Sequence, residues 1–330
     1  MVRRRDCLAL AAAAWGPWSL TTAAHAANAA NNARSPVLPQ LRIYVPGGTG
    51  GGWDQTGHAL GDAAVAAGLV QKVVYENKGG KGGTIGLADF VERYSKDPTA
   101  VLVGGMVMVG AIAASQPKVT LAQVTPLARL TNDYLAIVVP AGSKLNTLKA
   151  LTAELQRGVS GVPFTGGSLG GVDHMLAGMM IRQLRLDTDQ LRYEPATAAK
   201  ESLALIEAGK AQVLISGYSE LKADIEAKRL IALGVSSRRA LHGIPSLSEQ
   251  GVPIELANWR GVFAPAGISD VQKATLRDLV IAAAESSAWQ QTLNAKEWLG
   301  ALLTGDQFKQ ALEVDQSIAG VVAHMLKLKG

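Results

Sequence analysis

Cysteine is almost absent from this chain, since Cys7 is the only one among 330 residues. It lies ahead of an apolar run near the N-terminus and away from any cleavage site, where a lipid anchor would require it. A chain that loses this N-terminal run keeps no thiol and no disulfide, so its fold rests on packing alone. The five histidines show no paired ligand spacing. We therefore predict no metal site and no cofactor.

Long apolar runs are absent after residue 26, where nothing approaches the ~20 apolar residues that a helical membrane span needs. Before it come a basic start at 3–5, a short apolar run at 8–20 and the small-residue pattern Ala24-His25-Ala26. This order is typical of a secretory signal peptide. We predict that residues 1–26 are cleaved on export, by a Sec or twin-arginine route that stays open, and that residues 27–40 form a disordered lead-in.

Strong charge of one sign is missing as well. The formal net charge of +5 falls to +3 once a signal peptide with three Arg and one Asp is removed. The remaining basic residues are scattered and have no aromatic residues between them, which excludes the usual footprint of nucleic-acid binding. We expect no nucleic-acid partner.

Glycine and apolar residues are plentiful, with 36 glycines and 48% apolar residues. Short β-rich runs alternate with helical patterns, which is typical of a parallel sheet wrapped by helices. The sequence predicts two α/β units in turn. The first has strands at 41–45, 73–76, 101–103 and 135–140 and helices at 54–67, 86–94 and 148–157. The second has strands at 161–165, 192–193, 212–216, 230–236 and 261–264 and helices at 173–184, 198–207, 220–227, 270–293 (with room for a break) and 307–327.

One glycine-rich segment occurs twice. Residues 47–54 and 166–173 align without gaps in the pattern G-G-[ST]-x-G-G-[WV]-D, each after the first strand of a unit and at the start of a helix. Such turns expose backbone N–H groups beside the positive end of a helix, so two of them could hold a carboxylate from opposite sides. The alternative is a plain strand-to-helix connection with Asp54 and Asp173 as helix N-caps.

Two motifs suggest other functions. Gly166-Gly167-Ser168-Leu169-Gly170 matches the G-x-S-x-G elbow of α/β-hydrolases, which keeps a serine esterase open as an alternative. Neither His174, which is too close in sequence, nor the later His242 and His324 is marked as its base. The segment at 79–84 lacks the spacing of a phosphate loop and is explained by a turn.

The sequence also resembles a known family. The matching stretches are 46–59, 76–90, 102–112, 165–177 and 255–270, with strings such as Gly51-Gly52-Trp53-Asp54-Gln55-Thr56 and Asn258-Trp259-Arg260-Gly261-Val262-Phe263-Ala264-Pro265. They resemble the receptors of tripartite tricarboxylate transporters, the Bug proteins, and most closely the tricarboxylate-receptor branch. The resemblance runs from about residue 41 to the end. Around positions 47–49 this chain has Gly or Thr where many relatives have Pro or Ser.

This resemblance implies an α/β fold like that of type II periplasmic binding proteins, with two α/β lobes and a ligand cleft between them. The first lobe would comprise 41–133 and 255–330, and the second 134–254, with crossings near 134–139 and 252–259. It also implies a monomer in the periplasm that delivers a carboxylate to the large and small integral membrane subunits of a transporter. Whether Arg129 or Arg260 contacts a distal carboxylate, or pairs with acids such as Asp133 or Glu255, stays open.

We therefore predict a solute receptor without catalytic activity that binds a citrate-like di- or tricarboxylate. A sensor that reports to a membrane kinase is a further alternative. Small and hydroxylated residues at other strand ends could complete the cleft around the two glycine loops. The predicted ligand-binding residues are Gly47, Gly48, Thr49, Gly51, Gly52, Trp53, Asp54, Gly105, Met106, Thr165, Gly166, Gly167, Ser168, Gly171, Asp173, His174, Thr197, Ser216, Gly217 and Tyr218.

Overall fold

The computed structural model describes residues 38–196 and 199–328. The predicted signal peptide and most of the predicted lead-in lie outside these residues. Leu38, near the end of that lead-in, donates its N–H to the carbonyl of Leu69 at 3.1 Å and forms a parallel bridge with Val70. The chain is therefore tied to the fold from Leu38 onward.

A mixed sheet forms the first lobe. Its order is β2-β1-β3-β9-β4, with β10 on the other edge of β4, and β9 runs antiparallel to both β3 and β4. In this lobe the predicted parallel arrangement holds only for β1 with β2 and β3. The strands are β1 (Leu41–Val45), β2 (Val73–Asn77), β3 (Ala100–Gly105), β9 (Ala257–Pro265), β10 (Leu299–Thr304) and the first part of β4 (Val124–Pro140).

Strand β4 passes from the first lobe into the second. It pairs with β9 as far as Tyr134 opposite Ala257, and from Leu135 opposite Gly217 it pairs with β7 instead. The second-lobe sheet then continues through parallel β7, β5 and β6, while β8 also pairs with β4. These strands are β5 (Phe164–Gly166), β6 (Tyr193–Pro195), β7 (Val213–Gly217) and β8 (Leu230–Val235).

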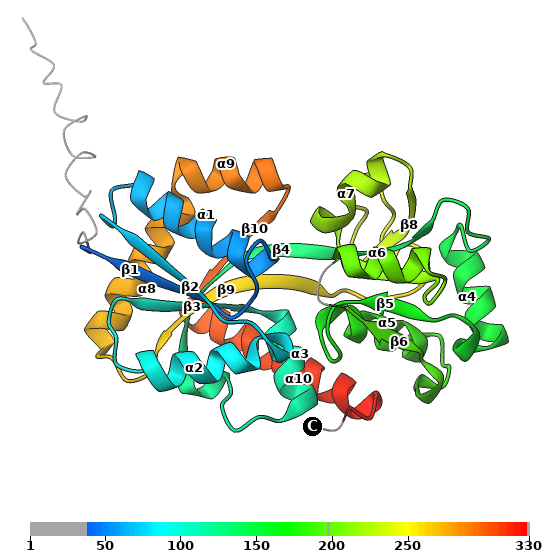
Figure 1. The fold of residues 1–330 in the computed structure, drawn as a ribbon, viewed down its shortest axis with the longest axis horizontal. Coiled ribbons are helices and arrows are strands. Elements are labelled where there is room, and N and C mark those ends of the chain that lie inside the picture. The colour runs from blue at the N-terminus through cyan, green and yellow to red at the C-terminus, as the bar shows by residue number, and fades with distance from the viewer. Residues whose placement is uncertain (1–37, 197–198, 329–330) are drawn as a thin grey trace, which may run out of the picture. The chain divides into compact units, whose positions relative to one another are not determined.

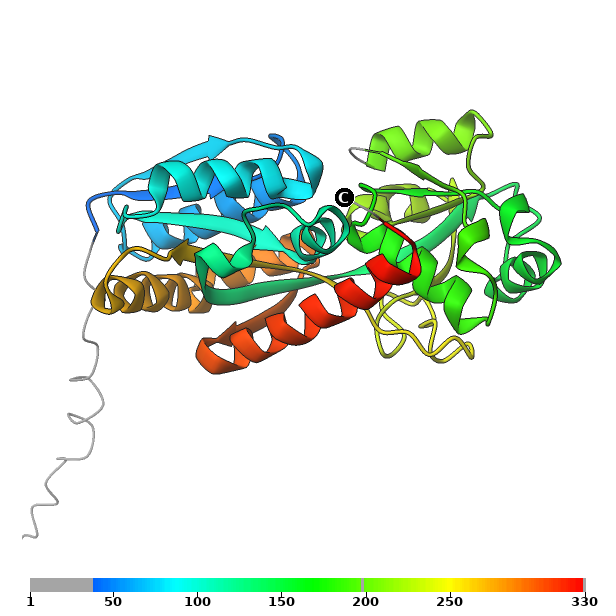
Figure 2. The ribbon, with the colours of Figure 1, turned by 90° about the horizontal axis from the view of Figure 1, so that it is seen from below.

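Helices cover both faces of each sheet. In the first lobe, α1, α8 and α9 lie on one face and α2, α3 and α10 on the other (Figure 1). Figure 2 shows α10 running beneath the first lobe toward the second. The helices are α1 (Gly52–Ala66), α2 (Thr84–Tyr94), α3 (Met106–Ser115), α8 (Asp270–Glu285), α9 (Ser287–Lys296) and α10 (Gly305–Met325), with α4 (Leu148–Arg157), α5 (Val172–Gln183), α6 (Ala199–Glu207) and α7 (Tyr218–Glu226) in the second lobe.

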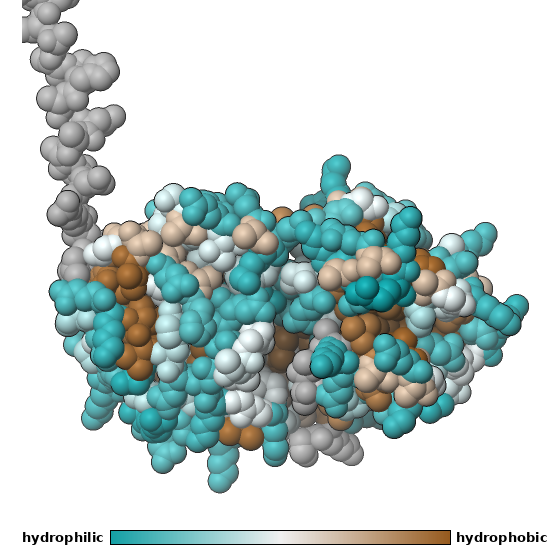
Figure 3. Space-filling model, turned by 45° about the horizontal axis from the view of Figure 1, so that its top comes forward, coloured by the Kyte–Doolittle hydropathy of each residue, from teal (hydrophilic) through white to brown (hydrophobic). Residues whose placement is uncertain are grey.

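The alternation of side chains along the strands supplies both faces of the core. Leu41, Ile43 and Val45 of β1 are buried with α1 and α8, whereas Tyr44 is buried on the opposite face with Leu87. Because successive side chains in a strand point to opposite faces, a strand covered on both sides is apolar throughout. The surface seen in Figure 3 is mostly hydrophilic, with separate apolar areas on both lobes.

Three parts of the first lobe were not predicted from the sequence. One is the first-lobe part of β4, from Val124 to Tyr134, since a strand was predicted only at 135–140. Helix α3 begins at Met106, directly where β3 ends, and β10 pairs with β4 ahead of α10. The predicted break in the helix at 270–293 is confirmed, because Ser286 is extended (φ −68°, ψ 155°) and its hydroxyl accepts the N–H of Trp289. Within the described residues, no helix is long and apolar enough to cross a membrane.

Candidate binding site

The two glycine loops share one backbone conformation, but the residues that are equivalent in the structure are offset by one from those that the gapless sequence alignment pairs. Gly50 (φ 82°) and Gly170 (φ 74°) are both left-handed. The next residue in each loop, Gly51 or Gly171, is extended and is the helix N-cap. Gly50 therefore corresponds to Gly170, and the gapless sequence alignment is wrong by one residue.

This register changes the role of the acidic residues. Asp54 lies in the first turn of α1, where Oδ2 accepts the N–H of Gly50 at 2.7 Å. At the corresponding place in the second loop, His174 Nδ1 accepts the N–H of Gly170 at 3.1 Å. The alternative in which Asp54 and Asp173 cap their helices is wrong, because Gly51 and Gly171 occupy the N-cap positions. Each loop is held instead by an acceptor in the first turn of its helix.

Trp53 and Asp173 are the second corresponding pair. A Cβ on Gly47 would lie 3.5 Å from the Trp53 ring, and a Cβ on Gly167 would lie 2.5 Å from Asp173 Oδ2. Trp53 packs against the apolar clusters on both faces of the sheet, as a packing anchor does. Asp173 Oδ2 accepts the N–H of Gly167 at 3.2 Å.

Burial changes the protonation of the second loop. Loss of solvent and, to a smaller extent, the nearby Glu220 carboxylate together raise the pKa of Asp173 to about 7. Burial lowers the pKa of His174 to about 4, and its ring stacks on Tyr193 with 4.2 Å between centroids. His174 is only 5% exposed.

The tips of the two loops have different surroundings. The first tip, residues 48–51, is exposed. The second packs on α3, where a Cβ on Gly110 would lie 2.2 Å from the Gly170 carbonyl oxygen. The glycine at position 110 therefore permits a close approach between the second-lobe loop and a first-lobe helix.

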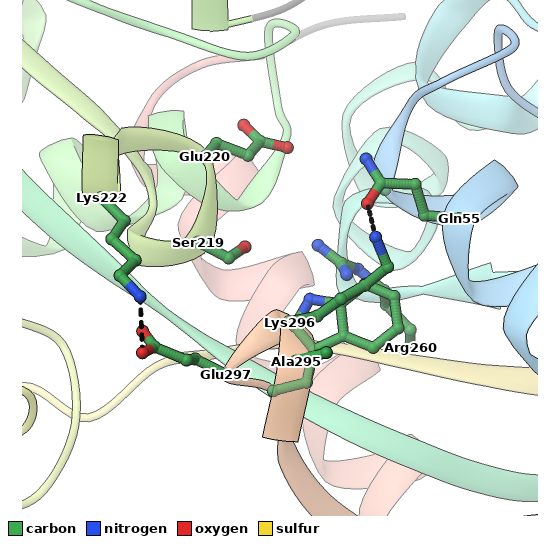
Figure 4. Close-up of a pocket in the computed structure, with 10 residues that line it drawn as sticks. Gln55, Ser219, Glu220, Lys222, Arg260, Ala295, Lys296 and Glu297 are labelled. Atoms are coloured by element: carbon green, nitrogen blue, oxygen red, sulfur yellow. Dashed lines mark hydrogen bonds and ion pairs between the residues drawn. The ribbon is translucent and has the colours of Figure 1, made fainter. Parts of the chain in front are cut away.

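A cavity of ≈ 270 Å³ lies beside the first loop, between elements of both lobes. Gly52 at the start of α1 borders it from the first lobe. The end of α9 (Ala295 and Lys296) also borders it from the first lobe, and the start of α7 (Ser219 and Glu220) borders it from the second (Figure 4). Its lining residues are Gly52, Gln55, Ser219, Glu220, Lys222, Arg260, Ala295, Lys296, Glu297 and Trp298.

Arg260 is the buried cation of this cavity. Its Nη2 lies 3.1 Å from Asp133 Oδ2, and Asp133 also accepts the hydroxyl of Ser219 at 2.8 Å. The guanidinium lies 5.0 Å from the centre of the Trp298 ring, and a Cβ on Gly52 would be 2.8 Å from Nη2. Nη1 is buried and has no hydrogen-bond partner among the described residues.

Arg129, the other candidate arginine, is held elsewhere. It donates to Asn132 Oδ1 at 2.9 Å through Nε and lies 3.8 Å from Asp315. Of the two, only Arg260 lines the cavity, and its partner is one of the acids proposed from the sequence.

The other predicted residues surround this region without lining the cavity. Met106 is fully buried, Gly105 lies against the Trp259 carbonyl, and the Thr165 hydroxyl donates to the Glu194 carbonyl at 2.8 Å. The predicted residues on β7 and α7 pack locally: the Ser216 hydroxyl donates to Glu220 at 2.7 Å, Gly217 lies against Asp133, and Tyr218 stacks on His242. Thr197 lies outside the described residues.

Ser168 does not have the surroundings of an elbow nucleophile. The left-handed residue of its loop is Gly170, whereas the hydrolase motif places its serine on the strained turn. Over residues 38–196 and 199–328, no hydrogen bond joins the Ser168 hydroxyl to a histidine, and no group of side chains is arranged to hold a metal ion.

Sequence reasoning missed most of the cavity. Lys296 ends α9, and Glu297 and Trp298 lie between α9 and the unpredicted β10, far along the chain from either glycine loop. One signal was available, because Arg260 stands in a string that resembles the receptor family, beside a strand predicted at 261–264.

Comparison with known proteins agrees with this fold. Protein BugT of Bordetella pertussis is 26% identical over 87% of this chain and 89% of its own length. The "UPF0065 protein in tcbD-tcbE intergenic region" of Pseudomonas sp. (strain P51) is 27% identical over 60% of this chain, which spans only 60% of that relative.

Two solved structures from Rhodopseudomonas palustris share the fold. MatC with bound malate superposes with a TM-score of 0.72 and 19% identity, over 86% of this chain and 98% of its own. A protein with adipate gives a TM-score of 0.75 and 18% identity, over 87% of this chain and 97% of its own. Residues 61–315, which follow the first glycine loop, match the family described as "Tripartite tricarboxylate transporter family receptor". The chain therefore belongs to the tripartite tricarboxylate transporter receptor family, the solute-binding receptors that include the Bug proteins.

Proposed function

We propose that this chain captures a small carboxylate between its lobes and performs no chemistry on it. The observation that carries the proposal is a cavity bordered by helix N-termini from both lobes, α1 through Gly52 and α7 through Ser219 and Glu220. A helix N-terminus carries about half a positive charge and N–H groups without intrahelical partners, so two of them favour an anion between the lobes.

The proposed ligand is a di- or tricarboxylate, citrate included. Malate and adipate, the molecules bound to the two R. palustris proteins, are dicarboxylates and support a ligand of this class. A ligand that contacts both lobes only when they are closed shifts the population toward the closed form. We propose lobe boundaries at 133/134 and 254/255, within two residues of the points where β4 changes partner after Tyr134 and where β9 begins at Ala257.

We further propose that the receptor works in the periplasm after loss of residues 1–26 and delivers its ligand to the large and small membrane subunits of a transporter. Membership of the receptor family supports this role. A sensor that reports to a membrane kinase would capture its ligand in the same way.

Calorimetric titration tests the proposal. Protein that has been unfolded and refolded to remove bound solute is titrated with citrate, tricarballylate, succinate, malate, glutamate and neutral compounds. We expect stoichiometric binding of one carboxylate without turnover. Binding of none of the acids would refute the carboxylate assignment and leave only the fold.

One glycine of the first loop can be substituted without a steric clash. A Cβ at Gly48 meets nothing within 4 Å, so Gly48→Val should fold normally and lose binding if the loop holds the ligand. Gly142 is equally open and lies in a distant exposed turn, so Gly142→Val is the matched control. Gly167→Val is less suitable because it would clash with Asp173. Full affinity in Gly48→Val would remove the first loop from the site.

The esterase alternative has a separate test. The wild type should not hydrolyse a simple ester such as p-nitrophenyl acetate above the buffer rate. Hydrolysis that disappears in Ser168→Ala would overturn the claim that the receptor performs no chemistry.

A further inference from the structure

Arg260 lines the cavity and has an unsatisfied buried donor. The residue is 3% exposed, and its Nη1 has no partner among the described residues. A guanidinium carries five N–H donors, and Asp133 takes one of them at 3.1 Å. Buried charged donors without partners are costly, so an orphan of this kind on the wall of a cavity points to a ligand atom as its partner.

The guanidinium is fixed in place before any ligand arrives. It is held between the α1 backbone at Gly52, where only a glycine leaves room, and the ring of Trp298. Asp133, itself fixed by Ser219, orients it from the side. Figure 4 shows the guanidinium pointing toward the space between Ser219 and Gln55. A positioned, planar fork of this kind suits a carboxylate better than a flexible ammonium group does.

The charged residues of the cavity differ in their pairing and in their burial. Lys222 is engaged by Glu297 at 2.6 Å, and Lys296 donates to Gln55 at 2.9 Å, so Arg260 is the deeply buried cation. Glu220 lines the second-lobe side, with the Asp173 carboxyl near enough to interact with it electrostatically. A negative group placed toward Glu220 is repelled, because like charges a few ångströms apart cost free energy in a partly buried site.

We propose that Arg260 binds one carboxylate of a dicarboxylate and that Glu220 rejects a third, so that this receptor selects ligands with two carboxylates. The second carboxylate then lies toward the exposed N–H groups of the first glycine loop, which directly precedes Gly52. This inference rests on the proposed carboxylate-receptor function and narrows its ligand class.

The test compares succinate, which has two carboxylates, with butyrate, which has one on a chain of the same four carbons, and with tricarballylate, which has three on a chain one carbon longer. In the wild type, succinate should bind most tightly. Arg260→Gln should weaken succinate about 10- to 100-fold, as expected for loss of a charge-assisted hydrogen bond, and change butyrate little. The affinity of Arg260→Lys for succinate should lie between those of the wild type and of Arg260→Gln, because lysine keeps the positive charge but lacks the planar set of donors of a guanidinium. Glu220→Gln should increase the affinity for tricarballylate more than the affinity for succinate.

Two controls keep the result interpretable. Arg260→Gln leaves Asp133 buried without its cation, so the double variant Arg260→Gln/Asp133→Asn removes that imbalance and should show the same change in ligand preference. Arg129→Gln alters another largely buried arginine that does not line the cavity, and it should preserve the preference. Thermal melting confirms that each variant is folded.

The two proposals fail in different ways. If the wild type binds carboxylates but the succinate-to-butyrate affinity ratio is unchanged in both Arg260 variants and in the double variant, Arg260 binds neither carboxylate of succinate and only this inference falls. If the wild type binds no carboxylate, the proposed function falls with it.

Discussion

Two neighbouring residues of the second glycine loop should give the stability of this protein opposite responses to pH. Asp173 is buried beside the Gly167 N–H, and His174 is buried with Nδ1 accepting from Gly170. Asp173→Asn keeps an oxygen acceptor for Gly167, and His174→Asn keeps one for Gly170. Each substitution therefore removes a titrating group while leaving an acceptor for the loop hydrogen bond.

The signs follow from the pKa of each group in the folded chain. Burial raises the pKa of Asp173 from 3.8 to about 7, so the folded state takes up its proton more readily and the wild type loses stability as the pH rises through this range. Burial lowers the pKa of His174 from 6.5 to about 4, so the folded state resists protonation and stability is lost as the pH falls.

The magnitudes are similar and nearly cancel in the wild type. At 1.36 kcal/mol for each pKa unit, Asp173 contributes about 4 kcal/mol and His174 about 3 kcal/mol between about pH 4 and pH 7. Relative to the wild type, Asp173→Asn should therefore gain about 4 kcal/mol in free energy of unfolding as the pH rises. His174→Asn should gain about 3 kcal/mol as the pH falls.

Urea unfolding of the three proteins from about pH 4 to pH 8 measures these differences directly. Referring each variant to the wild type at the same pH cancels the titration of all other groups. Differences that stay flat across the range would show that neither residue is buried as described, and differences of the same sign would refute the assignment of their protonation states.

Two further changes address contacts between the lobes. Gly110→Ala places a Cβ 2.2 Å from the Gly170 carbonyl and forces α3 away from the second loop, so ligand affinity in a titration should fall about 10-fold and the melting temperature should fall as well. Undiminished affinity would show that this contact is not needed for binding. Glu297→Gln removes the ion pair with Lys222, which is about one third exposed. Affinity should fall by no more than about 5-fold at low salt and by less at high salt, and a loss independent of salt would contradict an electrostatic role.

The first strands and helices could be predicted because their apolar residues recur with a regular period and because clear turn residues bound them. Strand β1 was predicted with its observed bounds, and α4 likewise, since Thr147 caps that helix and Arg157 ends it. Helix α3 was missed because its sequence, Met106–Ser115, is apolar on all sides and carries no capping residue. Such a run is buried all round and shows no helical period.

The glycine repeat shows that an alignment of residue types can pair positions that are not equivalent in the structure. The two Asp residues align in sequence, yet Asp54 performs the same task as His174 in the folded loops. Both an oxygen and an imidazole nitrogen can accept a backbone N–H, so hydrogen-bonding geometry preserves the acceptor and not the residue type.

The sequence by itself determined the α/β class, the two glycine loops and most of the helices and strands, because these depend on local period and local turn chemistry. Only the tertiary structure decided which side chains meet at the cavity. Arg260 meets Asp133 because β9 and β4 pair antiparallel, and it meets Gly52 and Trp298 because α1 and the segment between α9 and β10 pack beside that pair. These partners are separated by tens to hundreds of residues, and only long-range strand pairing and packing bring them together.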